Sequence, residues 1–180
     1  MTYQFQYDWF SVHIPLFQRL LGEFAGKPAN ALEIGTHEGR SATWLLTNIL
    51  THPQARLLSI DIFEQHVLRE NLREAGAELR ADVRIGYSRD VLHSVPPATF
   101  DFAYIDGSHW ACDVLEDAVT VFRRVKTGGL IGFDDYLWDD PAFNLHGTPK
   151  PAIDAFLSCY AHKLAVLEKG YQVWIRKLAD

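Results

Sequence analysis

Short hydrophobic runs alternate along the chain with longer stretches in which apolar residues recur every three or four positions. The short runs are typical of buried strands, and the spaced stretches are typical of amphipathic helices. On this basis, strands are predicted at residues 29–34, 57–60, 83–85, 100–105 and 130–133. Helices are predicted over residues 14–24, 40–50, 63–75, 114–122 and 153–160, with the pair Gly128-Gly129 ending the fourth of them.

The end of the chain carries a different signal. Two apolar runs, Leu164 to Leu167 and Tyr171 to Ile175, straddle Lys169-Gly170 and predict a closing hairpin. Strands that alternate with helices form a parallel sheet with helices on both faces. The sequence therefore predicts an α/β fold: a Rossmann-like, mostly parallel, doubly wound sheet with a C-terminal antiparallel hairpin strand.

No internal repeat, low-complexity tract or charged tail interrupts the 180 residues, and a chain of that length can bury one proper core. We expect a single domain over residues 1–180. Residues 1–28 would form an N-terminal helical cap segment, and residues 29–180 would form the Rossmann-like core.

Composition and charge narrow the choice of partners. The chain carries 17 Lys and Arg against 23 Asp and Glu, a formal net charge of -6, so nucleic acid is a poor partner. The N-terminus lacks the basic start and apolar run of a signal peptide, and no apolar stretch approaches the roughly 20 residues that span a bilayer. A cytoplasmic protein without a membrane partner is expected. Cys112 and Cys159 fall in amphipathic segments and are expected to be buried, inert thiols.

Acidic residues stand at the ends of most predicted strands. In open α/β sheets, ligands bind beyond the carboxyl ends of the strands. At or directly after those ends lie Glu33, Asp61, Asp106 and the pair Asp134-Asp135. A purely structural edge would not need so many carboxylates, so this edge is the candidate ligand site.

The loop after the first strand reads Leu32-Glu-Ile-Gly-Thr-His-Glu-Gly-Arg-Ser41. Gly35 permits a sharp turn off the strand, and Gly39 permits close packing where the helix begins. Backbone N–H groups there, with the Ser41 hydroxyl, can receive a carboxylate. The dinucleotide pattern GxGxxG is absent, because His37 takes the place of the second glycine. The alternative is an ordinary tight turn between a strand and a helix.

Asp61 follows the second strand. An acidic side chain at this place can accept hydrogen bonds from both hydroxyls of a ribose. The alternative is that Asp61 caps a helix that starts at Phe63. The two roles are compatible.

The strongest chemical signal lies in two stretches, Phe100 to His109 and Gly128 to Asp135. They bring Asp106, Asp134 and Asp135 to neighbouring strand ends, where three carboxylates would repel one another unless they are protonated or bridged by a cation. Oxygen-only ligands favour Mg²⁺, Mn²⁺ or Ca²⁺ over zinc. The alternative is that Asp134 and Asp135 cap a turn while Asp106 binds only a cofactor amine.

Taken together, these segments resemble the class I S-adenosylmethionine-dependent methyltransferases, particularly the small metal-dependent O-methyltransferases. Two branches are similar, the catechol O-methyltransferase type and the antibiotic-sugar enzymes related to macrocin O-methyltransferase. The motifs Ile105-Asp-Gly-Ser-His109 and Phe133-Asp-Asp-Tyr136 carry the second likeness. The resemblance runs from about Ala29 to Tyr136 and implies a single methyltransferase domain.

The resemblance implies a role for each matching residue. The methionine part of S-adenosylmethionine would be surrounded by Glu33, Gly35, Thr36, His37, Gly39 and Ser41. The ribose and adenine would be held by Asp61, Ile62, Ser88 and Arg89. Asp106 would bind the metal, most simply Mg²⁺, and lie near the cofactor amine, while Asp134 and Asp135 would complete the protein ligands.

His109 and the acceptor are the remaining points. His109 stands where the catechol-type enzymes carry a lysine that deprotonates the substrate, and an imidazole can take that proton. The expected catalytic residues are therefore His109 and Asp106; the alternative for His109 is a local bond at a helix start. The loop from Trp138 to Pro151, with His146, is expected to border a small-molecule acceptor such as a sugar, a phenol or a natural-product intermediate.

Three other functions remain open at this stage. One is a metal-independent N- or C-methyltransferase, and another is a non-catalytic cofactor-binding module. A nicotinamide-dependent oxidoreductase is disfavoured by the missing GxGxxG and the closing hairpin. A homodimer is implied by the family resemblance alone.

Overall fold

The computed structural model describes residues 2–141 and 147–180. By its internal contacts the chain divides into two compact units, Met1–Gly86 and Tyr87–Asp180. Each unit pairs a set of strands with a set of helices, and each is described by itself.

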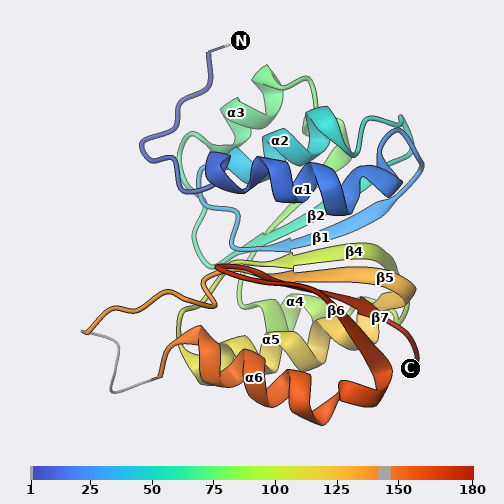
Figure 1. The fold of residues 1–180 in the computed structure, drawn as a ribbon. Helices are drawn as coiled ribbons and strands as arrows, with labels where there is room; N and C mark the ends of the chain where they lie inside the picture. Colours follow the sequence, from blue (N-terminus) through green and yellow to red (C-terminus); the bar gives the residue numbers. More distant parts are fainter. Residues whose placement is uncertain (1, 142–146) are drawn as a thin grey trace. The chain divides into compact units, whose positions relative to one another are not determined.

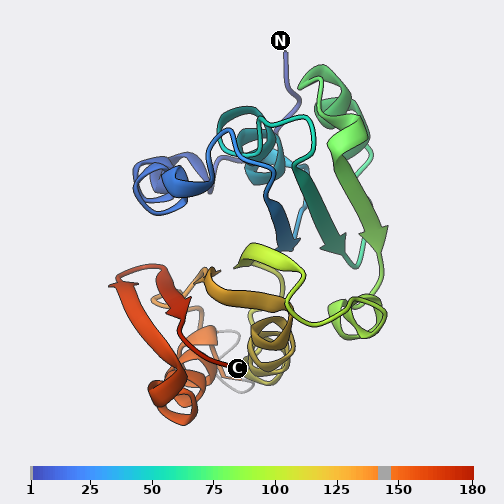
Figure 2. The ribbon, with the colours of Figure 1, turned by 90° about the vertical axis from the view of Figure 1, so that its right-hand side faces the viewer.

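The first unit contains three parallel strands in the order β3-β2-β1, and Figure 2 shows them running side by side in one direction. The strands are β1 (Asn30–Ile34), β2 (Arg56–Asp61) and β3 (Ala81–Ile85). The helices α1, α2 and α3 lie on one side of β1 and β2 (Figure 1). They span Ile14–Leu21, Arg40–Asn48 and Leu68–Glu74, and short 3-10 helices cover Ser11–His13, Gly22–Phe24 and Glu78–Arg80.

The second unit contains four strands in the order β4-β5-β7-β6. Strands β4 (Phe100–Ile105) and β5 (Val125–Phe133) are parallel, whereas β7 (Val173–Lys177) runs antiparallel to β5 and to β6 (Leu164–Lys169). Figure 1 shows the helices of this unit on one side of these strands. They are α4 (Ser88–His93), α5 (Ala111–Arg124) and α6 (Pro149–Cys159), followed by a 3-10 helix at Ala161–Lys163.

The predicted α/β fold, with mostly parallel strands and a C-terminal antiparallel hairpin, is confirmed. Apolar periodicity located the helices because their apolar faces form the two cores. In the first unit Phe17, Leu32 and Leu45 are fully buried, and in the second unit Phe102 and Phe156 are equally enclosed. Of the described helices, none is long and apolar enough to cross a membrane.

Two predictions about helices were wrong. The helix expected over residues 63–75 begins only at Leu68, because Phe63 is 69% exposed and contributes nothing to an apolar face. The helix α4 was not predicted at all. It has six residues, of which Leu92 alone is buried, so it shows no periodic pattern.

The prediction that Gly128-Gly129 ends a helix was wrong. The pair lies inside β5, which already begins at Val125. A Cβ atom at position 129 would lie 2.6 Å from the backbone oxygen of Asp101, so the glycine permits close approach to the neighbouring strand. The pairing of β4 with β5 shifts register beside it, between Phe100 and Phe102.

The prediction of buried cysteines was also wrong, since Cys112 and Cys159 are both exposed. Cys112 is the second residue of α5 and Cys159 is the last residue of α6. At helix ends such as these, amphipathic spacing does not determine which side chains are covered.

One row of residues crosses three strands of the second unit. Tyr104 on β4 pairs with Gly132 on β5, which pairs with Trp174 on β7. The Tyr104 and Trp174 rings lie parallel, with an interplanar angle of 6° and centroids 6.2 Å apart. A Cβ atom at position 132 would lie 2.5 Å from the Trp174 ring, so only glycine leaves room for this aromatic layer.

Candidate functional site

The glycine loop between β1 and α2 turns through three left-handed residues, Gly35 (φ 90°), His37 (φ 49°) and Gly39 (φ 82°). The Gly39 N–H donates to the Thr36 carbonyl at 2.8 Å, which closes the turn before α2 begins. A Cβ atom at Gly39 would lie 2.6 Å from Leu68 Cδ1, so the close packing expected of this glycine is present. The Thr36 hydroxyl is buried and has no hydrogen-bond partner among the described residues.

Glu33 lies fully buried at the end of β1, directly before this loop. Its Oε1 atom accepts a hydrogen bond from Ser41 Oγ at 2.6 Å, and its Oε2 atom accepts one from Ser59 Oγ at 3.1 Å. Burial raises the pKa of Glu33 from 4.5 to about 7, although the neighbouring hydroxyls of Ser41, Ser59 and Thr36 oppose the shift. The Ser41 hydroxyl proton is thus directed to Glu33.

The raised pKa of Glu33 predicts a pH-dependent stability. Because the folded state holds this proton more tightly than the unfolded chain, the stabilisation is complete below pH 4.5 and is lost as the pH rises through about 7. Glu33→Gln keeps an acceptor for Ser41 and cannot ionise. Between about pH 5 and about pH 8, the wild type should lose about 2 kcal/mol more free energy of unfolding than the variant. Urea unfolding at both pH values measures this, and equal losses would contradict the buried, proton-binding carboxyl.

Asp61 connects the end of β2 to the glycine loop. Its Oδ2 atom accepts the His37 N–H at 2.8 Å, and its Oδ1 atom accepts the Phe63 N–H at 3.1 Å. The alternative that Asp61 caps a helix starting at Phe63 is wrong, because α3 begins at Leu68. Ile62, beside it, is 53% exposed. Asp61 therefore fixes the backbone of the glycine loop. The side chain of Ile62 next to it is apolar and lies on the surface.

Ser88 and Arg89 stand at the start of α4, and both contact acidic residues of α5. Ser88 Oγ donates to Asp117 Oδ1, and Arg89 Nη1 lies 3.6 Å from Glu116 Oε2. Asp117 is 4% exposed, and burial raises its pKa to about 6 against the lowering effect of Ser88. The Arg89 guanidinium also lies over the Tyr87 ring, 4.6 Å from its centroid. This acid-rich contact positions the predicted adenine-binding residues.

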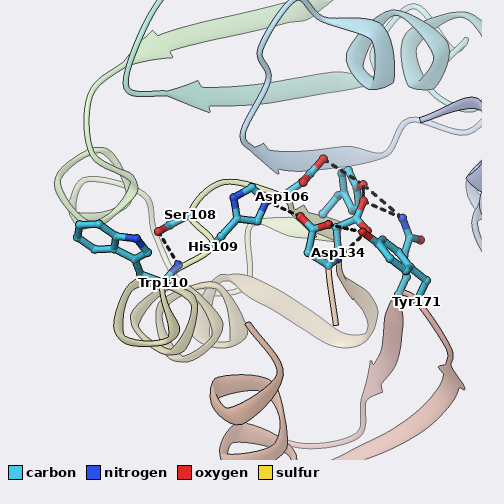
Figure 3. A network of polar contacts seen from close by, with 9 residues as sticks. Asp106, Ser108, His109, Trp110, Asp134 and Tyr171 are labelled. Carbon is cyan, nitrogen blue, oxygen red and sulfur yellow. Dashed lines mark hydrogen bonds and ion pairs between the residues drawn. The ribbon is translucent and has the colours of Figure 1, made fainter. Parts of the chain in front are cut away.

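Asp106 and Asp134 come together through a shared phenol. Tyr104 Oη donates to Asp134 Oδ2 and lies 3.2 Å from Asp106 Oδ2. Asp134 Oδ2 also accepts a hydrogen bond from Gln172 Nε2 at 3.0 Å. Figure 3 shows the side chains of Asp106 and Asp134 approaching each other from the ends of β4 and β5. The structure thus brings together two of the three predicted metal ligands.

Asp135 faces other partners. It has a left-handed backbone (φ 58°), and its Oδ2 atom lies 2.7 Å from His109 Nε2, while its Oδ1 atom accepts from Tyr171 Oη at 3.0 Å. The hydrogen bond to Asp135 raises the pKa of His109, and the nearby charge of Asp134 raises it further. Burial and the same carboxylate hold the pKa of Tyr171 well above its ordinary value, so this phenol remains a donor.

The His109 ring is oriented from a second side as well. It stacks on Trp138, with centroids 4.5 Å apart and an interplanar angle of 21°. Two hydrogen bonds of Ser108 hold the loop that carries His109. Ser108 Oγ donates to Asp113 Oδ2 at 2.8 Å. It also accepts the Trp110 N–H at 3.1 Å (Figure 3). The ring is 38% exposed and can exchange a proton with a neighbouring group. His146, in the predicted acceptor loop, lies outside the described residues.

The donor chemistry of this cluster fits a hard divalent cation. Asp106 and Asp134 offer carboxylate oxygens to the same phenol, and carboxylate oxygen is a ligand that Mg²⁺ and Ca²⁺ prefer. In the part of the chain that the structure describes, no group of three or more His, Cys, Asp or Glu side chains converges as a metal site does. Asp135 differs from the other two acids in that both its oxygens contact His109 or Tyr171.

Several partners of the predicted site residues were not themselves predicted from the sequence, namely Tyr104, Gln172, Tyr171, Trp174 and Asp117. A signal existed for two of them. Tyr104 precedes Asp106 by two positions, so both side chains point to the same face of β4. Asp117 interrupts the apolar face of α5, where a buried charge marks a specific contact. Gln172 and Tyr171 carried no such signal.

Comparison with known proteins places the chain in a family. Residues 32–136 match a family model described as a methyltransferase domain. Catechol O-methyltransferase of Mycobacterium tuberculosis is 29% identical over 116 residues, which cover 58% of this chain and 52% of that protein. The chain thus spans about half the length of this curated relative.

Solved structures share the fold. Cofactor-bound Rv0187 from MTB has a TM-score of 0.75 at 21% identity, covering 97% of this chain and 84% of that chain. The MycE methyltransferase from the mycinamycin biosynthetic pathway, in complex with Mg and SAH, has a TM-score of 0.71 at 18% identity, covering 97% of this chain and 52% of that chain. The predicted resemblance to class I O-methyltransferases is confirmed. Because the family model matches more than half of its residues, the chain belongs to the methyltransferase domain family.

Proposed function

We propose that this protein transfers a methyl group from S-adenosylmethionine to a hydroxyl of a small molecule, with the help of a divalent cation, most simply Mg²⁺. One observation carries the proposal. The family match over residues 32–136 contains the glycine loop, Asp61, Asp106, His109 and the pair Asp134-Asp135. The candidate residues for binding the cofactor and the cation therefore lie within the region that matches the family model.

The first unit offers the residues for the methionine part and the ribose of the cofactor, whereas Ser88, Arg89 and Asp106 belong to the second unit. The left-handed glycine loop and the unpartnered, buried Thr36 hydroxyl provide polar backbone and side-chain groups for a ligand carboxylate. Glu33, Ser41 and His37 support this loop, and Asp61 accepts hydrogen bonds at the position where class I enzymes hold a ribose. Bound S-adenosylmethionine supplies a methyl group that its positive sulfur has already activated, so the protein's task is positioning.

The second unit offers the groups that would act on the acceptor. Asp106 and Asp134 would hold the cation, with Asp135 as a further ligand. The cation lowers the pKa of an acceptor hydroxyl when it is bound. His109, oriented by Asp135 and Trp138, would take the hydroxyl proton on its imidazole ring. The contact with Asp135 favours this role, because it raises the proton affinity of the ring.

The proposal also covers the class of acceptor and the assembly. The net charge of -6 disfavours nucleic acid, and a small acceptor agrees with the mycinamycin-pathway enzyme that shares the fold. A homodimer stays a prediction. The two competing functions, a metal-independent N- or C-methyltransferase and a non-catalytic cofactor-binding module, predict different responses to chelation and to acceptors.

Calorimetric titration of S-adenosylhomocysteine, first with Mg²⁺ and then with EDTA, tests the proposal. Binding is expected in both conditions, because the predicted contacts to the methionine part and the ribose lie in the first unit and need no cation. An acceptor screen with S-adenosylmethionine should then give methylated hydroxyl compounds with Mg²⁺ and none with EDTA. Failure to bind S-adenosylhomocysteine in either condition would refute the cofactor. Activity that survives exhaustive chelation would favour the metal-independent enzyme.

A further inference from the structure

Three paired strand residues of the second unit each have a partner two positions away, at or just beyond the strand end. Side chains two positions apart on a strand share a face. Tyr104 and Asp106 are related in this way, as are Gly132 and Asp134, and Gln172 and Trp174. The pairing of Tyr104 with Gly132 and of Gly132 with Trp174 sets the three pairs beside one another. The row of Tyr104, Gly132 and Trp174 therefore lies two residues along the strands from a polar row formed by Asp106, Asp134 and Gln172.

The hydrogen bonds between these two rows have a fixed direction. The indole N–H of Trp174 can only donate, and it donates to Gln172 Oε1 at 3.0 Å. The Gln172 amide nitrogen therefore points the other way, and donates to Asp134 Oδ2 at 3.0 Å and to Tyr104 Oη at 3.3 Å. Because the phenol oxygen accepts from Gln172, its proton is directed at the two carboxylates.

This network is rigid because it is buried. Tyr104 and Gln172 are each 1% exposed, and Trp174 is fully buried. Trp174 packs against the backbone of Gly132 and against the Tyr104 ring, so it cannot turn without opening the aromatic layer. A buried polar chain of this kind, with each donor matched to an acceptor, specifies one arrangement of its members.

We propose that Tyr104 and Gln172 are positioning residues that set the Asp106 and Asp134 carboxylates in place for a divalent cation. The inference deepens the proposed function and rests on it. Two carboxylates that approach the same point repel each other, and the shared phenol and the amide offset that repulsion before a cation arrives. They also fix the direction of Asp134, whose Oδ1 atom accepts the Asp135 N–H at 2.7 Å. Donors that orient metal ligands in this way strengthen binding of the ion.

Titration of Mn²⁺ into the whole protein tests this inference, with the electron paramagnetic resonance signal of free Mn²⁺ as the readout. Tyr104→Phe removes only the hydroxyl and retains the stacked ring. Gln172→Met removes the amide at nearly constant length. We expect both variants to bind Mn²⁺ about 10- to 100-fold more weakly than the wild type. Their affinity for S-adenosylhomocysteine should change far less, because neither substitution removes a residue that is predicted to bind the cofactor.

Tyr160→Phe is the matched control. It removes a phenolic hydroxyl from a packed ring of the same unit, which contacts Phe122 and Phe156. Its affinity for Mn²⁺ should equal that of the wild type. Thermal unfolding of all variants separates loss of the fold from loss of the ion, and Gln172→Met carries the test should Tyr104→Phe not fold.

The possible failures can be told apart. Equal or tighter Mn²⁺ binding by both folded variants, beside a wild type that binds, would overturn the positioning role. Tighter binding would mean that the phenol and the amide compete with the cation for the carboxylates. A wild type that binds S-adenosylhomocysteine but no Mn²⁺ would instead refute the metal in the proposed function, and this inference with it.

Discussion

Simultaneous replacement of Asp134 and Asp135 by alanine should abolish methyl transfer while S-adenosylhomocysteine still binds. The double variant removes the carboxylate that Tyr104 and Gln172 orient, and it removes the carboxylate that contacts His109. Charge stabilisation by a catalytic cation contributes several kcal/mol, so turnover should fall by about 10³-fold or more. Turnover is measured with an acceptor found by screening, and cofactor affinity by calorimetry.

Asp82→Ala provides a control for this loss of charge, because it removes an exposed carboxylate that pairs with Arg84 at 2.7 Å on β3. It should retain wild-type turnover. Wild-type turnover in the double variant would refute the metal role of the pair. Loss of S-adenosylhomocysteine binding together with turnover would show that the two acids support the cofactor or the fold.

Replacement of His109 should cause the second large loss. A positioned general base contributes about 10²- to 10⁴-fold to the rate, so His109→Ala should lower turnover by that factor. The ring also stacks on Trp138, and a second variant separates the two roles. His109→Phe retains an aromatic ring on Trp138 but cannot accept a proton. If His109 is the base, both variants should be equally inactive with saturating acceptor and Mg²⁺.

Recovery of turnover in His109→Phe would contradict the base and assign the ring a packing role. His93→Ala is the matched control, since His93 is an exposed histidine at the end of α4 in the same unit. It should behave as the wild type in turnover and in Mn²⁺ binding.

The strands and their acidic ends could be predicted from the sequence because both follow from short-range rules. The buried strand Phe100–Ile105 is apolar apart from Asp101, and the residue after such a strand lies at the sheet edge. Asp106 and Asp134 were located in this way, and the structure joins them through one phenol. The close packing at Gly39 was also predicted, and the structure shows that its neighbour is Leu68 of α3.

The partners of these acids could not be predicted, because they depend on how distant strands pair. Gln172 reaches Asp134 only since β7 lies antiparallel beside β5, with a register that a sequence does not reveal. The different roles of Asp134 and Asp135 arise from the left-handed backbone of Asp135, which turns its carboxylate toward His109. Helix α4 was not predicted because six residues are too few to show a repeating pattern of apolar positions.

The cross-strand pair of Gly132 and Trp174 has a consequence for how this sequence can evolve. A side chain at position 132 and an indole at position 174 exclude each other, because the first would overlap the second. Trp174 in turn donates to Gln172, which holds Asp134. Homologues should therefore show correlated change at these two positions, with a larger residue at 132 accompanied by a smaller one at 174. Homologues without Trp174 lack its hydrogen bond to Gln172, so another group must orient Gln172 there. The residue at position 132 therefore affects how the Asp134 carboxylate is held.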